Sequence, residues 1–115
     1  MKALSKTEQI DTMVAHLRSM KKRSDCWGGH CLYLTADGNK CPVGCLLPDG
    51  HPGQKFNGAV GRLLQSYPDL RARVDLDIGQ EFQNFHDHSN SWNKSGGIKK
   101  KELKKVEQRI REDYV

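Results

Sequence analysis

The chain has 115 residues, of which 36% are hydrophobic, and a formal net charge of +5 at pH 7. This length fits a single small globular domain over residues 1–115, and the periodic placement of the apolar residues argues against a wholly disordered chain. No apolar run approaches the roughly 20 residues that cross a bilayer, and the opening residues MKALSKTEQI lack a secretory signal, so we expect a cytoplasmic protein without a membrane partner.

Residues 5–22 have the spacing of an amphipathic helix. Apolar residues recur on one face every three or four positions: Ile10, Met13, Val14, Leu17 and Met20. Ser5 and Glu8 fit a capping box, in which the serine hydroxyl and the glutamate carboxylate each accept from a backbone N–H of the other residue. The predicted helix therefore begins at a defined residue.

The next stretch, residues 31–45, predicts a β-hairpin. Residues 31–35 alternate as a strand would, and Asp37-Gly38 is typical of a two-residue hairpin turn. Residues 40–45 would return antiparallel, with Pro42 at a position that needs no N–H. Because two strands alone are marginally stable in water, the hairpin is expected to pack on helices.

Three further helical segments are expected after a loop rich in proline and glycine. The first starts near Asn57 and is interrupted at Pro68. The second is capped by Asp75 or Asp77, and the third spans residues 98–113. The predicted class is α+β: a short antiparallel β-hairpin packed against four or five α-helices.

The cysteines allow three interpretations. In one, Cys31, Cys41 and Cys45 bind a structural zinc ion with a histidine as the fourth ligand. The candidates are His30, His51, His86 and His88, and the set to test takes His86. The Cys41–Cys45 spacing lies at the outer limit for a zinc knuckle, so this remains an alternative. In another, Cys41 or Cys45 is a nucleophile and His86 its base, although the neighbouring Asp87 should point about 100° away from His86.

The third interpretation is that the cysteines are small buried residues, because free cysteine is among the most buried residue types. This is the leading interpretation. It predicts no cofactor and no catalytic group, and it leaves the surface charges to make the contacts.

Basic residues cluster near the end of the first helix and in the last one. We expect electrostatic contacts from these residues: Lys21, Lys22, Arg23, Lys99, Lys100, Lys101, Lys104 and Lys105. The alternative is that they are solvated helix faces. No aromatic residue is interleaved with the terminal lysines, which disfavours a platform for stacking single-stranded bases. Contacts between lysine and phosphate would not depend on the base sequence of a nucleic acid.

The string CLYLTADGNKCPVGCLLPD, followed by His86-Asp87, Trp92 and a charged terminal helix, resembles short proteins of unassigned activity. Tailed bacteriophages, prophages and some bacteria encode these proteins. The chain departs from them at Leu34 and Pro42, where relatives often have arginine and alanine.

The resemblance implies a small accessory protein that acts in the bacterial cytoplasm. The leading functional hypothesis is a non-enzymatic binding module that acts on a host protein or on an acidic ligand, either nucleic acid or a nucleotide. The alternatives are the structural zinc domain and, after it, the cysteine–histidine enzyme.

Overall fold

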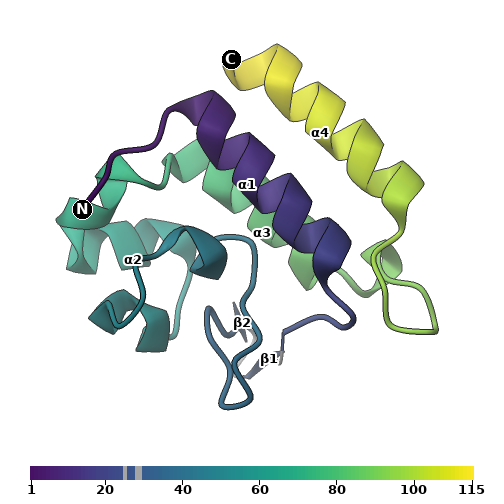
Figure 1. Cartoon of the computed structure of the whole chain (residues 1–115), viewed down its shortest axis with the longest axis horizontal. Coiled ribbons are helices and arrows are strands. Elements are labelled where there is room, and N and C mark those ends of the chain that lie inside the picture. Colours follow the sequence, from purple (N-terminus) through teal and green to yellow (C-terminus); the bar gives the residue numbers. More distant parts are fainter. Residues whose placement is uncertain (25, 28–29) are drawn as a thin grey trace.

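Helices form the fold of the chain (Figure 1). The computed structural model describes the backbone of residues 1–24, 26–27 and 30–115, and the side chains of residues 1–24 and 32–115. Within them the α-helices are α1 (Lys6–Ser19), α2 (Val60–Ser66), α3 (Leu76–Asp87) and α4 (Lys100–Tyr114). Short 3-10 helices are η1 (Gly44–Leu46), η2 (Pro52–Lys55), η3 (Pro68–Ala72) and η4 (Ser89–Ser91).

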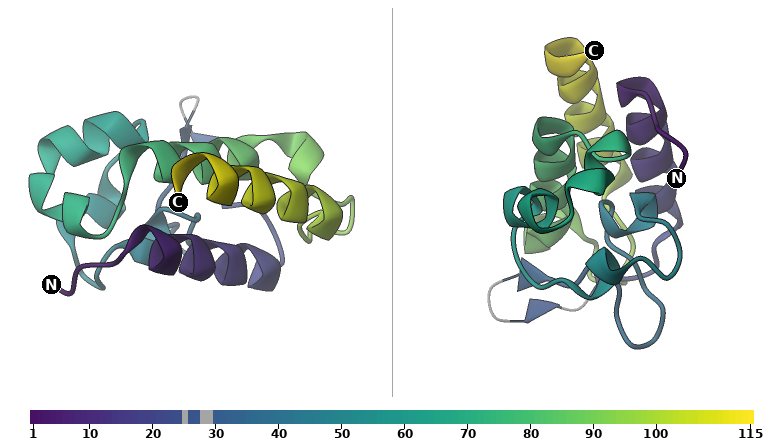
Figure 2. Two further views of the ribbon diagram at one scale, coloured as in Figure 1. Left: turned by 90° about the horizontal axis from the view of Figure 1, so that it is seen from above. Right: turned by 90° about the vertical axis from the view of Figure 1, so that its left-hand side faces the viewer.

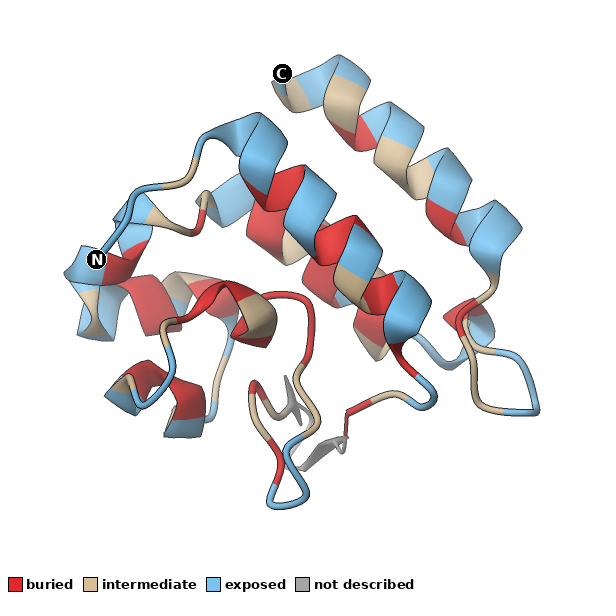
Figure 3. Cartoon of the chain, in the orientation of Figure 1, coloured by how far each residue is buried: buried red, intermediate tan, exposed pale blue. Residues whose placement is uncertain are grey.

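Three helices surround the core. α1 and α3 pack against each other, and α4 contacts both and runs along the seam between them (Figure 2). α2 packs on α3, and η1 packs on α1. The buried face of each long helix points to this centre (Figure 3). Its largest contributors include Leu17, Leu63, Phe82 and Leu103, each fully buried.

The predicted helix starts are confirmed where local capping controls them. Ser5 Oγ accepts from the Glu8 N–H at 3.1 Å, and Ser5 N–H donates to Glu8 Oε1 at 2.9 Å, so the capping box opens α1. Of the two candidate caps for α3, Asp75 is the one used, since its Oδ1 accepts from Ile78 N–H at 3.0 Å. The predicted break at Pro68 separates α2 from η3.

The predicted β-hairpin over residues 31–45 is wrong, and so is the α+β class. Among the described residues, the two limbs of this segment share one isolated bridge, between Leu34 and Lys40. A tight turn does form at Asp37-Gly38, with Gly38 at a φ of 85°. The fold is all-α, with one two-residue antiparallel pair, β1 (Cys26–Trp27) and β2 (His30–Cys31), in which Cys26 lies opposite Cys31.

The returning limb curls into a helical turn because its backbone bonds locally. Cys45 N–H donates to the Cys41 carbonyl at 3.0 Å, and Leu46 N–H donates to the Val43 carbonyl at 3.0 Å. Pro42 has no N–H to give to a ladder. The turn packs its small residues into the core, where Gly44 lies so close to the Tyr33 carbonyl that a Cβ would be 1.9 Å from that oxygen.

Replacing Gly44 by alanine is therefore expected to destabilise the protein by about 3 kcal/mol or more, because the added methyl collides with backbone that cannot yield cheaply. The measurement is the free energy of unfolding in urea. Gly61→Ala in α2 is the matched control, because its Cβ would meet only Leu76 Cδ1, at 3.8 Å. This control should be neutral or up to about 0.5–1 kcal/mol more stable. Equal stability of the two variants would contradict the packing described.

Candidate functional site

The thiols of Cys41 and Cys45 are packed inside the fold. Cys41 is fully buried, and its Sγ accepts from Gly44 N–H at 3.2 Å. Cys45 is partly buried, and its Sγ donates to the Pro42 carbonyl at 2.9 Å. Burial raises the pKa of Cys41 well above its usual range and raises that of Cys45 to about 12. Both sulfurs are therefore protonated and unreactive at neutral pH.

His86 is the centre of a buried hydrogen-bonded cluster near the end of α3. Its Nε2 accepts from the Ser24 N–H at 3.1 Å, and its Nδ1 donates to Asp87 Oδ1 at 2.7 Å. Its carbonyl accepts from Trp92 Nε1 at 2.8 Å, and the two rings meet edge to face with centroids 5.5 Å apart. Arg23 Nη1 donates to the Asp87 carbonyl at 2.8 Å. We call these five residues the His86 cluster.

The orientation of Asp87 differs from the sequence-based expectation. Adjacent helical residues point about 100° apart, yet the Asp87 carboxylate reaches the His86 ring next to it. Gln83 holds this carboxylate from one helical turn earlier, with Nε2 at 2.9 Å from Asp87 Oδ1. The bond fixes the Nδ1–H tautomer of His86 and leaves Nε2 as an acceptor that Ser24 already occupies.

These contacts do not bring together the predicted cysteine–histidine pair, or the described members of the predicted zinc set. Neither Cys41 nor Cys45 forms a hydrogen bond with His86, whose two nitrogens are already engaged. The side chain of Cys31, the remaining predicted zinc ligand, lies outside the described residues. Among those described, no three histidine, cysteine or acidic side chains could hold one ion.

A second cluster lies on the surface where the end of α1 meets the start of α4. Two shallow depressions, of about 520 and about 530 Å³, adjoin there and share Asn93, Ile98 and Lys100. Five cations line them: Arg18, Lys21, Lys99, Lys100 and Lys101. We call this surface the basic groove. Four of its five cations were predicted; Arg18 was missed, although it stands three residues before Lys21 in the sequence.

Gly96 fixes the distance between the two sides of the basic groove. It has a φ of 108°, and a Cβ at this position would lie 2.5 Å from the Lys21 carbonyl oxygen. The loop that leads into α4 therefore lies directly against the backbone that leaves α1. Lys99 N–H donates to the Ser91 carbonyl at 2.8 Å, which anchors the other end of this loop.

Among the residues that the structure describes, the cations of the basic groove have no acidic partner. None of the five forms an ion pair within the described part of the chain. Among the lining residues that the structure describes, the only acid is Glu102, which pairs with Lys105 at 3.5 Å. Lys99 is the N-cap of α4 and supplies no side-chain cap, so the positive end of this helix also faces the basic groove.

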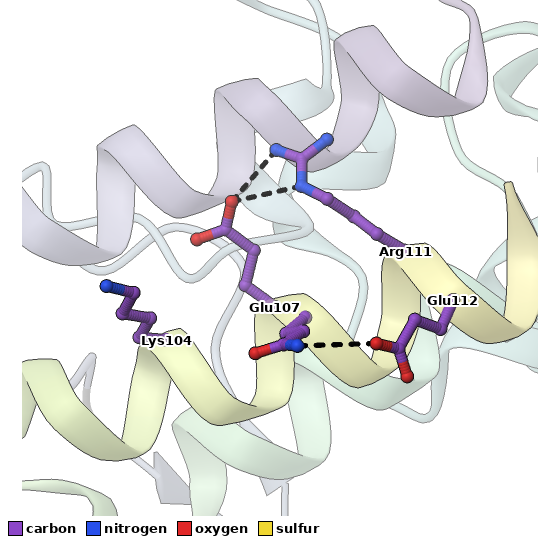
Figure 4. Close-up of a pocket in the computed structure, with 5 residues that line it drawn as sticks. Lys104, Glu107, Arg111 and Glu112 are labelled. Atoms are coloured by element: carbon purple, nitrogen blue, oxygen red, sulfur yellow. Dashed lines mark hydrogen bonds and ion pairs between the residues drawn. The ribbon is translucent and has the colours of Figure 1, made fainter.

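The other predicted contact residues lie elsewhere or are engaged. Lys22 pairs with Asp37 at 3.0 Å, and Arg23 belongs to the His86 cluster. Lys104 lines a separate depression of about 400 Å³ along α4, where Glu107 and Arg111 point toward α1 (Figure 4). There Arg111 pairs with Glu107 at 3.0 Å and Gln108 donates to Glu112 at 3.3 Å, so Lys104 shares this surface with two carboxylates. That all eight residues contact a ligand stays a prediction.

No protein-family model, curated protein or solved structure matches this chain. Within the described residues, no helix is both long enough and apolar enough to span a bilayer. The His86 cluster and the basic groove are therefore the features of the molecule that bear on its function.

His86 is expected to make the protein less stable in weak acid. Burial lowers its pKa, although the hydrogen bond with Asp87 opposes the change. The unfolded chain binds this proton near pH 6.5 and the folded chain binds it only at lower pH, so unfolding takes up a proton between the two values. The free energy of unfolding should be level above about pH 7 and fall below about pH 6.5, by up to about 1.4 kcal/mol per pH unit from this group.

Urea unfolding at a series of pH values measures this fall, and NMR titration of the His86 ring gives its pKa directly. His86→Gln should flatten the fall, whereas His88→Gln, at an exposed position, should leave it unchanged. A His86 pKa at or above 6.5 would show that the imidazole is not held neutral.

The two thiols should label slowly in the folded protein at pH 7, because burial keeps them protonated. Iodoacetamide labelling followed by trypsin and mass spectrometry isolates them, since cleavage after Lys40 and Lys55 releases one peptide with Cys41 and Cys45. The same peptide from urea-unfolded protein is the control. Labelling of the folded chain at least as fast as the unfolded one would restore the nucleophile interpretation.

Proposed function

We propose that the chain is a small phage-type accessory protein that acts in the bacterial cytoplasm as a non-enzymatic module and binds an acidic ligand in the basic groove. One observation carries this proposal. Five cations from two segments, residues 18–21 and 99–101, converge on one surface without an acidic partner among the described residues. A solvated helix face would not require two distant segments to meet.

Without a bound anion, the clustered cations of the basic groove lower the stability of the folded protein. Like charges held close together repel one another, and the lysines at the start of α4 stand at the positive end of the helix dipole. Farther along the same helix, Lys105, Arg109 and Arg111 each have an acidic partner, as Arg111 has in Asp11 at 2.6 Å. An anion in the basic groove would relieve both unfavourable terms at once.

The reactive side chains support a binding role over an enzymatic one. Both described thiols are protonated and packed, and the imidazole of His86 is buried with both nitrogens in use. The lysines and arginine of the basic groove, by contrast, are at least partly exposed and form no ion pair with a described residue, and they are gathered on one surface. The resemblance to phage proteins supports the host context, in which the acidic ligand is a host macromolecule.

Retention on heparin, a polyanion that is neither protein nor nucleic acid, tests the basic groove. Lys21, Lys99, Lys100 and Lys101 are changed together to glutamine in the groove variant. We expect its affinity to fall at least about tenfold, since each exposed cation contributes up to about 1 kcal/mol at low salt.

The matched control removes four cations that lie away from the basic groove and form no ion pair in the described part of the chain: Lys2, Lys6, Lys55 and Arg62, again to glutamine. It has the same net charge as the groove variant and should lose no more than about threefold. Equal losses in the two variants would mean that heparin reads net charge alone, and the proposal would fail.

A further inference from the structure

We infer that the acidic ligand is the phosphate backbone of double-stranded nucleic acid, bound without regard to base sequence. This inference rests on the proposed function and narrows it to one class of ligand. Three features of the basic groove select that class: its large apolar residues are buried, none of its described lining residues is aromatic, and its cations come from two distant segments, residues 18–21 and 99–101.

The buried apolar residues argue against an acidic protein as the ligand. Stable protein interfaces draw their energy from aromatic and other large apolar anchors, and they are depleted in lysine. The large apolar side chains of the basic groove, Met20 and Ile98, are only 6% and 4% exposed. They form its floor and offer no surface to a partner, so contact is left to lysine and arginine.

The absence of rings argues against a single strand. Proteins that bind single strands without sequence preference stack bases on aromatic side chains, worth roughly 1–3 kcal/mol per base. Among the described residues that line the basic groove, none is aromatic. Trp92 stands nearby in sequence, but its indole is fixed edge-on to His86 and donates to the His86 carbonyl. Exposed bases would therefore gain nothing here.

The placement of the cations suits a charged backbone. Arg18 and Lys21, at and just after the end of α1, line one depression with Lys100, and Lys100 also lines the adjoining one with Lys99 and Lys101. Gly96 holds these two segments together. A duplex presents about one charge per 1.7 Å of axis, so it can engage both segments at once. The free N–H groups at the start of α4 add donors that phosphate oxygens accept.

Fluorescence anisotropy with labelled probes tests the inference on the full chain. The probes are a DNA duplex and an RNA duplex of about 20 base pairs, the matching single strands, and polyglutamate of similar charge. We expect either duplex to bind about tenfold or more tighter than the single strands or polyglutamate at about 50 mM salt. The two duplexes distinguish DNA from RNA as the source of the backbone, and duplexes of different sequence should agree within about threefold.

The dependence of duplex affinity on salt concentration reports the number of phosphate contacts. Five phosphate contacts predict a slope of about −4.5 in log K against log salt, or a loss on the order of 500-fold between about 50 and 200 mM. The groove variant, with one of the five cations left, should retain a slope of about −1 from this surface, whereas the control variant should keep the full slope.

A variant that changes the shape of the basic groove without changing its charge separates the two contributions to binding. Gly96→Ala forces the two segments apart, since its Cβ would lie 2.5 Å from the Lys21 carbonyl oxygen, and should weaken duplex binding several-fold at unchanged net charge. Gly61→Ala, in α2 and away from the basic groove, meets only Leu76 Cδ1 at 3.8 Å and should bind as the parent does. Circular dichroism of each variant confirms that it is folded.

The outcomes are distinct. Single strands binding as tightly as duplexes, or polyglutamate binding more tightly, would overturn the inference while groove-dependent heparin binding kept the proposed function. An unchanged salt slope in the groove variant would likewise overturn the inference. If heparin retention also ignored the groove variant, both would fall together.

Discussion

The buried imidazole of His86 joins three parts of the chain that are far apart in sequence. The ring accepts from Ser24 N–H just after α1 and is held by Asp87 on α3. The backbone carbonyl of His86 accepts from the indole N–H of Trp92, which precedes α4. A buried polar group without a partner costs a few kcal/mol, so each of these bonds constrains the others. The exits of α1 and α3 and the approach to α4 therefore meet at one residue, His86.

The basic groove depends on that arrangement. Its walls are residues 18–21 and 99–101, and both lie within a few residues of segments that the His86 cluster fixes. α4 itself is weakly embedded, with Leu103 and Ile110 as its fully buried side chains and ion pairs such as Arg111–Asp11 at its edge. The thiols of Cys41 and Cys45 and the imidazole of His86 are part of the packed interior, whereas the unpaired cations of the basic groove lie on the surface.

Features that depend on neighbouring residues were predicted correctly from the sequence, whereas features that depend on contacts between distant residues were not. The capping box at Ser5, the cap at Asp75 and the break at Pro68 depend on neighbouring residues, which a short window contains. The hairpin failed because a true turn at Gly38 is followed by a helical turn that Gly44 makes through contact with Tyr33. The basic clusters were visible, but their convergence across more than 70 residues requires Gly96, whose role only the fold reveals.

The edge-to-face contact between Trp92 and His86 gives the molecule a built-in optical probe. Imidazolium quenches indole emission more strongly than neutral imidazole does, so the brightness of Trp92 should follow the proton on His86. The same ring stands at the foot of the loop that leads into α4, where an occupied basic groove would alter its surroundings. Because the chain also contains Trp27, a Trp27→Phe variant isolates the emission of Trp92. That emission can then follow, in real time and without an added dye, both the acid sensitivity of the interior and events at the surface.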